Sequence, residues 1–278
     1  TSNSTIGAPL ATTASSLVRV QGDGTFGTGT LNLANGFTNN GAIELTNTSV
    51  NQGAALNVTA GTLVNPVGST ISVLAGAGGG PRTLSVELNN AGTVTIEQAA
   101  TLGRSSAQGV NSGTITLATG DLSLNGSGTS PTFTNTGTIN VPASRTLTLS
   151  NETFHLNGGG VSGAGTWSLS GSTLNLNVPH TIGPLVFAPT SSTINGPAPL
   201  TNGVGATTVG INTTVNAALV NNGTWVVRSS STQGGTLTSG AGSTLRLQGD
   251  GSFGTATLTV ANGFTNNGAI ELTNASAN

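Results

Sequence analysis

The residues that could perform acid–base or metal chemistry are few and widely spaced in this chain. Charged residues make up 5% of its 278 residues. The carboxylates are Asp23, Glu44, Glu87, Glu97, Asp121, Glu152, Asp250 and Glu271. Cleavage of a polysaccharide by two carboxyl groups requires them to lie close together. Glu87 and Glu97 are the closest pair that is not a repeat copy, and single solvated charges are the simpler interpretation of both.

The two histidines could form a metal-binding or pH-sensitive pair. His155 and His180 are separated by 25 positions, close to the length of one coil of the architecture inferred below. Neither has a cysteine or an obvious carboxylate partner to complete a metal site, so we expect surface or edge histidines.

Asp23 lies between two glycines, in a pattern that resembles calcium-binding β-roll repeats. Those repeats need an aspartate in every turn, whereas Asp23 occurs once per long repeat, as its copy Asp250 does. We therefore predict an aspartate that stabilises a turn. Arg19 lies four residues earlier and predicts a surface ion pair with Asp23. We predict no catalytic, cofactor-binding or metal-binding residue and no enzymatic activity.

The composition argues against nucleic-acid and membrane binding. Six basic residues and eight carboxylates give a net charge of −2, too little positive charge to attract phosphate. Hydrophobic residues make up 35% of the chain, enough for a core, while the polar residues are mostly Thr, Ser and Asn. Cysteine is absent, and no apolar run is long enough to span a bilayer. We expect no membrane insertion of this segment.

A long internal repeat organises the chain. The segments 21–51 and 248–278 are offset by 227 residues and differ at six of their 31 positions. Weaker matches extend upstream, so the second copy begins near residue 228. We therefore predict one repeat unit over residues 1–227 and the start of the next, continuous with it, over residues 228–278, as a fragment of a longer tandem array.

A short motif recurs within the long repeat. It consists of an apolar residue, Asn, Gly and two alternating apolar residues, and its glycines are Gly41, Gly92, Gly113, Gly137, Gly223 and Gly268, with weaker copies near Gly68, Gly165 and Gly205. The copy at Gly113 lacks the first apolar residue, because Gly109 replaces it. Alternation after each glycine predicts a half-buried strand, and Asn followed by Gly predicts a corner.

These periods predict an all-β, right-handed parallel β-helix with coils of about 20–28 residues. Each coil is expected to contain two or three strands. Asn residues at equivalent corners of successive coils are expected to stack into amide ladders, and Val, Ile and Leu to fill a core too narrow for large rings. Antiparallel sandwiches are the alternative architecture, but they space their turns more closely.

The Thr/Asn/Gly-rich coils, with Asn-x-Gly-Thr-Ile corners and no cysteine, resemble the β-helical repeats of filamentous haemagglutinin-type adhesins and autotransporter passenger domains of bacteria. The resemblance implies a secreted or cell-surface rod used in surface structure or adhesion. It transfers no functional residue and implies no cofactor.

Two classes of function follow from this interpretation. The first is a structural filament whose partners are neighbouring repeats and other copies in a fibre. The second is a binding surface for cell-surface glycans or ice. Ice binding would require aligned Thr-x-Thr segments such as Thr114–Thr116 and Thr146–Thr148, and unequal spacing between coils predicts that they are not aligned.

Overall fold

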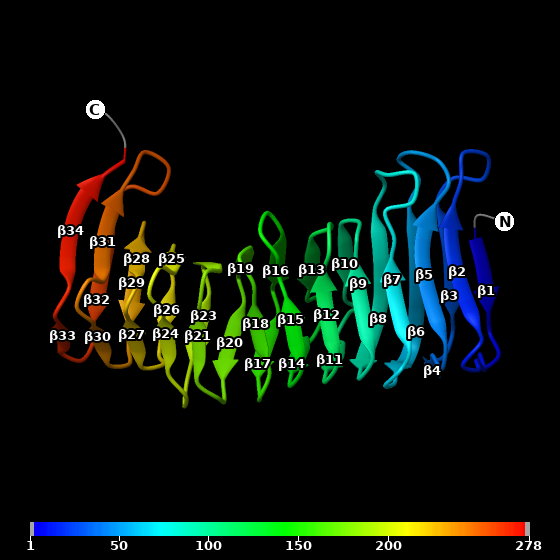
Figure 1. Cartoon of the computed structure of the whole chain (residues 1–278), viewed down its shortest axis with the longest axis horizontal. Helices are drawn as coiled ribbons and strands as arrows, with labels where there is room; N and C mark the ends of the chain where they lie inside the picture. The colour runs from blue at the N-terminus through cyan, green and yellow to red at the C-terminus, as the bar shows by residue number, and fades with distance from the viewer. Residues whose placement is uncertain (1–2, 276–278) are drawn as a thin grey trace.

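The chain winds into a parallel β-solenoid of about 12 coils of roughly 22 residues each (Figure 1). The computed structural model describes residues 3–275. In that range the regular secondary structure is entirely β-strand, and named strands pair only in parallel. The predicted all-β parallel solenoid is therefore confirmed, and the antiparallel alternative is excluded.

Each coil has three faces. The first face contains β1 (Asn3–Ile6), β3 (Gly29–Leu33), β6 (Ala54–Asn65), β8 (Arg82–Asn90), β10 (Ala100–Leu102), β13 (Leu122–Asn125), β16 (Thr146–Ser150), β19 (Thr166–Ser170), β22 (Val186–Thr190), β25 (Thr207–Gly210), β28 (Thr224–Val227), β31 (Thr244–Gly249) and β34 (Ala269–Asn274). The second face contains β4 (Phe37–Thr38), the ends of β6 and β8, β11 (Gln108–Asn111), β14 (Thr132–Asn135), β17 (Thr153–Leu156), β20 (Thr173–Leu176), β23 (Thr193–Asn195), β26 (Thr214–Val215), β29 (Ser230–Gln233) and β32 (Thr257–Val260). Because β6 and β8 continue around the corner, these two faces form one 22-stranded sheet.

The third face contains two further sheets. Its seven-stranded sheet consists of β2 (Leu17–Gly22), β5 (Ala42–Asn47), β7 (Thr70–Val73), β9 (Thr93–Ile96), β12 (Thr114–Leu117), β15 (Thr138–Asn140) and β18 (Gly160–Ser162). Its five-stranded sheet consists of β21 (His180–Ile182), β24 (Leu200–Asn202), β27 (Leu219–Asn221), β30 (Leu237–Ser239) and β33 (Phe264–Asn266).

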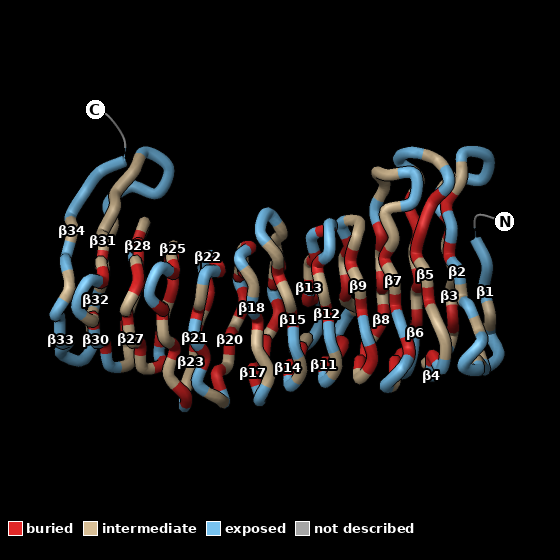
Figure 2. Tube along the Cα trace, in the orientation of Figure 1, coloured by how far each residue is buried: buried red, intermediate tan, exposed pale blue. Residues whose placement is uncertain are grey.

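Alternating side chains build the core. Along the strands, buried positions alternate with partly exposed ones, as the predicted half-buried strands require (Figure 2). Coil lengths range from 17 residues, between Thr207 and Thr224, to 28, between Ala54 and Arg82. The shortest coils are thus below the predicted range. Turns and loops absorb the differences, so the strands remain aligned.

The core also contains large rings, which the sequence-based prediction of a narrow aliphatic core did not anticipate. Trp167 is fully buried, and its ring centroid lies 5.8 Å from that of Phe154 and 5.1 Å from that of Phe187. Phe133 stacks on Phe154 with ring centroids 5.9 Å apart. These rings form a continuous aromatic segment in the middle of the rod.

The corner asparagines stack into amide ladders, as predicted, and these ladders lie at two different corners. The first ladder, between the second and third faces, joins Asn39, Asn65, Asn90, Asn111 and Asn135 through amide bonds of 2.7–2.8 Å. The second, between the third and first faces, includes a 2.7 Å bond from Asn202 to Asn221 and continues in register through Ser239 to Asn266. Copies of one motif therefore occupy two different corners.

The 227-residue repeat does not contain a whole number of coils. Strand β34 repeats the sequence AIELTN of β5, yet β5 lies on the third face and β34 on the first. The first-face ladder runs from β3 to β34 in eleven steps, and β5 follows β3 by two faces. One repeat therefore spans ten coils and one third, and each copied strand lies on the next face.

The coils twist about the axis of the rod, and this twist offsets the extra third of a coil in each repeat. In Figure 1 the lower edge is formed by second-face strands such as β4 and β14 toward the N-terminal end, and by third-face strands such as β30 and β33 toward the C-terminal end. Strand β4 and its copy β33 thus lie on the same edge although they belong to different faces. The two copies of this strand therefore lie on the same side of the rod in this view.

Candidate functional site

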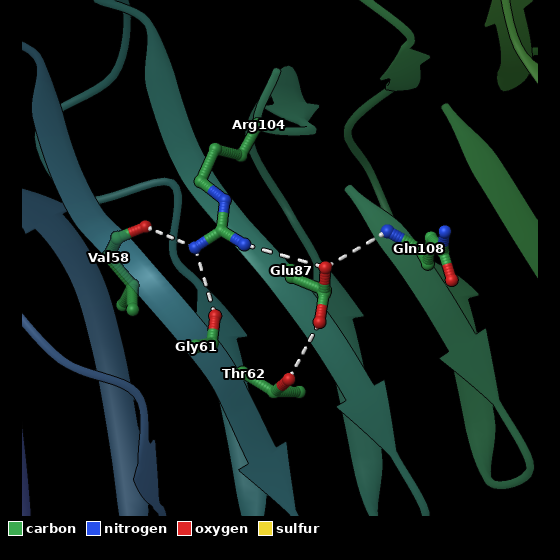
Figure 3. A network of polar contacts seen from close by, with 6 residues as sticks. All are labelled: Val58, Gly61, Thr62, Glu87, Arg104 and Gln108. Carbon is green, nitrogen blue, oxygen red and sulfur yellow. Dashed lines mark hydrogen bonds and ion pairs between the residues drawn. The ribbon is translucent and has the colours of Figure 1, made fainter. Parts of the chain in front are cut away.

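An ionic network joins three coils at the corner between the first and second faces (Figure 3). Arg104 Nη2 lies 3.4 Å from Glu87 Oε2, and Arg104 Nη1 donates hydrogen bonds of 2.9 Å to the carbonyl oxygens of Val58 and Gly61. Glu87 also accepts hydrogen bonds from Thr62 Oγ1 at 2.7 Å and from the backbone N–H of Gln108 at 3.2 Å. With its donors and acceptors occupied by the chain itself, the network serves to fix the corner where β6 bends.

The two glutamates that the sequence offered as a pair are not brought together. Glu87 belongs to β8 in the 22-stranded sheet, whereas Glu97 follows β9 in the seven-stranded sheet and accepts a hydrogen bond from the backbone N–H of Ala75. The structure thus provides no acid–base pair at these positions.

Asp23 forms a turn, as predicted, but its predicted ion pair with Arg19 is wrong. Asp23 Oδ1 accepts hydrogen bonds from the backbone N–H groups of Thr25 at 2.8 Å and Phe26 at 2.7 Å. Arg19 instead contacts Glu44 at 2.7 Å, because β2 and β5 place these residues side by side on adjacent coils. The ion pair joins coils and is not local in sequence.

The copied residues repeat this arrangement with one addition. Arg246 contacts Glu271 at 2.6 Å, as Arg19 contacts Glu44. Asp250 forms the equivalent turn, with hydrogen bonds of 2.8 Å from Ser252 and Phe253, and it also forms an ion pair with Arg228. The hydrogen bond from Phe253 and the contact with Arg228 lower the pKa of Asp250.

The histidines do not form a pair, and the expected exposed position is wrong for His180. His155 lies on the outer side of β17, where its Nδ1 is 3.3 Å from the amide of Asn175. His180 lies on β21 with 8% exposure, and its ring centroid is 5.7 Å from that of Trp167. Burial lowers its pKa to about 4, so the imidazole is neutral at physiological pH.

Glu152 is the carboxylate with the most unusual environment. It occupies an inward corner position that Ser172 and Ser192 hold in the following coils, and it is 7% exposed. A cavity of about 20 Å³ beside it is also lined by Gly109 and Phe133. Within residues 3–275 no group donates a hydrogen bond to its carboxyl oxygens, and burial raises its pKa to about 7.

The missing apolar residue of the Gly113 motif is explained by the ring of Phe133. A side chain at Gly109 would place its Cβ 2.7 Å from a ring carbon of Phe133. Phe133, from the next coil, therefore fills the space that a larger residue at position 109 would occupy.

Replacing Glu152 by Gln is expected to remove a pH-dependent loss of stability. The folded-state pKa of about 7 exceeds the ordinary value of 4.5, so stability is complete below pH 4.5 and falls as the pH rises through 7. The Glu152→Gln chain should therefore be more stable than the native chain by about 1–3 kcal/mol at pH 8, and equal to it at pH 4. Urea unfolding at both pH values measures this difference.

Glu152→Ser provides a matched control, because it introduces the hydroxyl that the next two coils carry at this position. It should abolish the same pH dependence. An equal pH dependence in the native and Gln chains would show that Glu152 is not the titrating group.

The outer faces carry straight rows of threonine. On the third face Thr93, Thr114 and Thr138 are in register, and on the second face the row consists of Thr132, Thr153, Thr173, Thr193, Thr214, Thr232 and Thr259. The segments Thr114–Thr116 and Thr146–Thr148 lie on the third and first faces and are not aligned with each other, as expected, although single threonines stay in register because loops absorb the unequal coil lengths. The rows give these faces a regular, uncharged surface.

No cluster of three or more His, Cys, Asp or Glu that could hold a metal occurs among residues 3–275. The same residues contain no helix of the length and hydrophobicity needed to cross a membrane. No protein-family model, curated protein or solved structure matches the chain. The distinctive features of the chain are therefore its rod, its surface loops and the threonine rows on its outer faces.

Proposed function

We propose that the chain is a structural segment of an extracellular or cell-surface fibrous protein, in which tandem repeats build a rigid rod. The observation that carries this proposal is the first-face ladder, which continues without interruption from β3 into β34. A parallel ladder transmits rigidity because each coil is hydrogen-bonded to its neighbours along the axis.

The repeat supports a role in extending length. The second copy continues the same rod and adds no separate domain, so duplication lengthens the protein without changing the three-faced cross-section of the rod. Neighbouring repeats of the same chain, and other copies in a fibre, are the proposed partners. A surface role similar to that of filamentous haemagglutinin-type adhesins is part of the proposal, and catalysis is not.

Electron microscopy can test the rod directly. At a coil spacing of about 4.8 Å, the chain should appear as a straight particle roughly 60 Å long, and each added 227-residue unit should lengthen it by about 50 Å. Bead-like particles joined by flexible linkers would contradict a continuous rod. Antibody labelling of intact producing cells tests the location, and label confined to the cytosol would contradict the surface role.

A further inference from the structure

One corner of the rod carries long loops that we name the loop crest. It consists of residues 23–28, 48–53 and 74–81, which join the third face to the first in three consecutive coils. These loops have six, six and eight residues, whereas the next eight connections at the same corner have two to five. In Figure 1 the crest extends above the rest of the rod at the N-terminal end.

Asn47 holds the crest in one shape from below. It is 3% exposed, and its Nδ2 donates hydrogen bonds to the carbonyl oxygens of Ser49 at 2.9 Å, Gln52 at 2.8 Å and Gly78 at 3.1 Å. Its Oδ1 accepts a 2.9 Å hydrogen bond from the N–H of Ala77. One buried amide thus ties two crest loops together.

Arg82 provides a second clamp. It is 1% exposed, and its guanidinium donates to the carbonyl oxygens of Gln52 at 3.1 Å, Gly80 at 3.2 Å, Gly79 at 3.3 Å and Ala75 at 3.4 Å. Burying a cation without a carboxylate partner is costly. The hydrogen bonds that offset this cost are all made to backbone carbonyl groups of the crest loops. A chain that only needed to continue its coils could use the short turns found elsewhere.

The outer surface of the crest combines apolar groups with neutral polar groups. Phe26 is 60% exposed and Val50 is 62% exposed, at the tips of adjacent loops. Around them are the hydroxyl and amide groups of Thr25, Ser49 and Asn51. The one carboxylate, Asp23, already binds two backbone N–H groups of its own turn, and Arg82 is buried.

This chemistry fits a neutral sugar. The C–H face of a sugar ring packs on an exposed aromatic ring, while its hydroxyl groups bond to amides and hydroxyls. The crest offers no accessible cation for a sulfate, carboxylate or phosphate group. A single aromatic anchor implies weak binding at each crest, which repetition along a rod would strengthen.

The first loop of the crest, residues 23–28, recurs in the second copy. The turn at Asp23 has its copy at Asp250, where Phe253 is 40% exposed and the guanidinium of Arg228 lies over its ring, 5.1 Å from the ring centroid. In Figure 1 both turns extend from the same upper edge, because the twist of the rod compensates for the extra third of a coil. Tandem units would therefore repeat this loop on one side, about 50 Å apart.

We infer that the loop crest is a binding site for neutral polysaccharide. The residues of one crest form this site whether or not the chain is part of a longer rod. Only the strengthening of binding by repetition rests on the proposed rod function.

Retention of the 278-residue chain on neutral polysaccharides tests this inference. The probes are insoluble β-1,4-glucan, β-1,3-glucan and α-1,4-glucan, with heparin as an anionic comparison. The native chain should bind at least one neutral glucan, and the Phe26→Ala/Phe253→Ala chain should bind it at least tenfold more weakly. The Phe26→Tyr/Phe253→Tyr chain should retain binding, because it keeps both aromatic rings.

Val204→Ala is the matched control, since Val204 is an 88% exposed apolar residue outside the crest. It should bind as the native chain does, and circular dichroism should show the same β-structure in each variant. Equal binding by the alanine double variant, no binding to the neutral glucans, or binding to heparin alone would each overturn the inference. Intact rods in electron micrographs of a non-binding chain would reject the crest site and leave the rod proposal standing.

Discussion

Replacing Asn90 by Ala is expected to lower the free energy of unfolding by about 2–4 kcal/mol. Asn90 is fully buried, accepts a 2.7 Å hydrogen bond from Asn65 and donates one of 2.7 Å to Asn111. The substitution leaves the buried Oδ1 of Asn111 without a donor and leaves Asn65 Nδ2 only two long hydrogen bonds of 3.5 Å, so both groups carry a desolvation cost. Urea unfolding followed by circular dichroism measures the loss.

The chain offers a matched control for this prediction in an outer asparagine ladder. Asn57 donates a 2.8 Å hydrogen bond to Asn32, which donates one of 2.7 Å to Asn3. Water can replace these bonds when one is removed, so Asn57→Ala should cost about 0.5 kcal/mol or less. Similar losses at Asn90 and Asn57 would contradict the view that buried amide ladders stabilise the coils. Hydrogen exchange should show the loss of protection centred on β8 and β11.

Replacing Trp167 by Ala is expected to cost about 3–5 kcal/mol. Trp167 is fully buried and contacts Phe154, Phe187 and His180, so its removal leaves a cavity lined by rings from neighbouring coils. Because each coil contacts only its neighbours, the damage should concentrate in the middle of the rod and weaken protection of β17, β19 and β22. Hydrogen exchange measures both the size and the position of the effect.

Trp167→Phe is the control, because it replaces the indole by a smaller aromatic ring and does not remove the aromatic side chain. It keeps an aromatic ring and should cost about half as much as the alanine variant. A cost below about 1 kcal/mol for Trp167→Ala would show that the aromatic segment is not needed for stability, as a purely aliphatic core would imply.

The local fold was predictable from the sequence because its signals are local. Apolar and polar residues alternate after Gly92, and in a strand this alternation alone decides which side chains point inward. Val94 and Ile96 are buried as expected. The asparagine two residues before each such glycine was likewise identified as a ladder residue from the motif alone. These features require no knowledge of which coil lies next to which.

The division of the motif between two corners could not be predicted in this way. Asn135 and Asn221 belong to copies of one motif, and the motif does not show that they lie at different corners. Between them the first ladder position is taken by Leu156, which pairs with Asn135, so that ladder ends there. The phase depends on the sum of many unequal coil lengths, and a spacing of 227 residues does not specify it.

Contacts between coils were the other source of error. Arg19 was matched with Asp23 because the two are close in sequence, whereas β2 and β5 place Glu44 beside it. His180 was expected at the surface because histidine is polar, but its strand points it toward Trp167. The clamp residues Asn47 and Arg82 were also missed. The one available signal was the unusual Gly-rich stretch 76–80, which would need support to hold one conformation.

Disulfide trapping tests the central claim most directly, namely that one solenoid carries each repeat ten coils and one third further along. The chain has no cysteine, so introduced pairs are unambiguous. Thr224 and Thr244 are partly exposed partners on β28 and β31 of the first face, at the roughly 4.8 Å spacing of parallel neighbours, which a disulfide can bridge. A repeat of whole coils would instead place Thr244 on the third face beside β27, because its counterpart Leu17 lies on that face. We predict that Thr224→Cys/Thr244→Cys forms an intramolecular disulfide and that Val220→Cys/Thr244→Cys does not, and the reverse result would contradict the account.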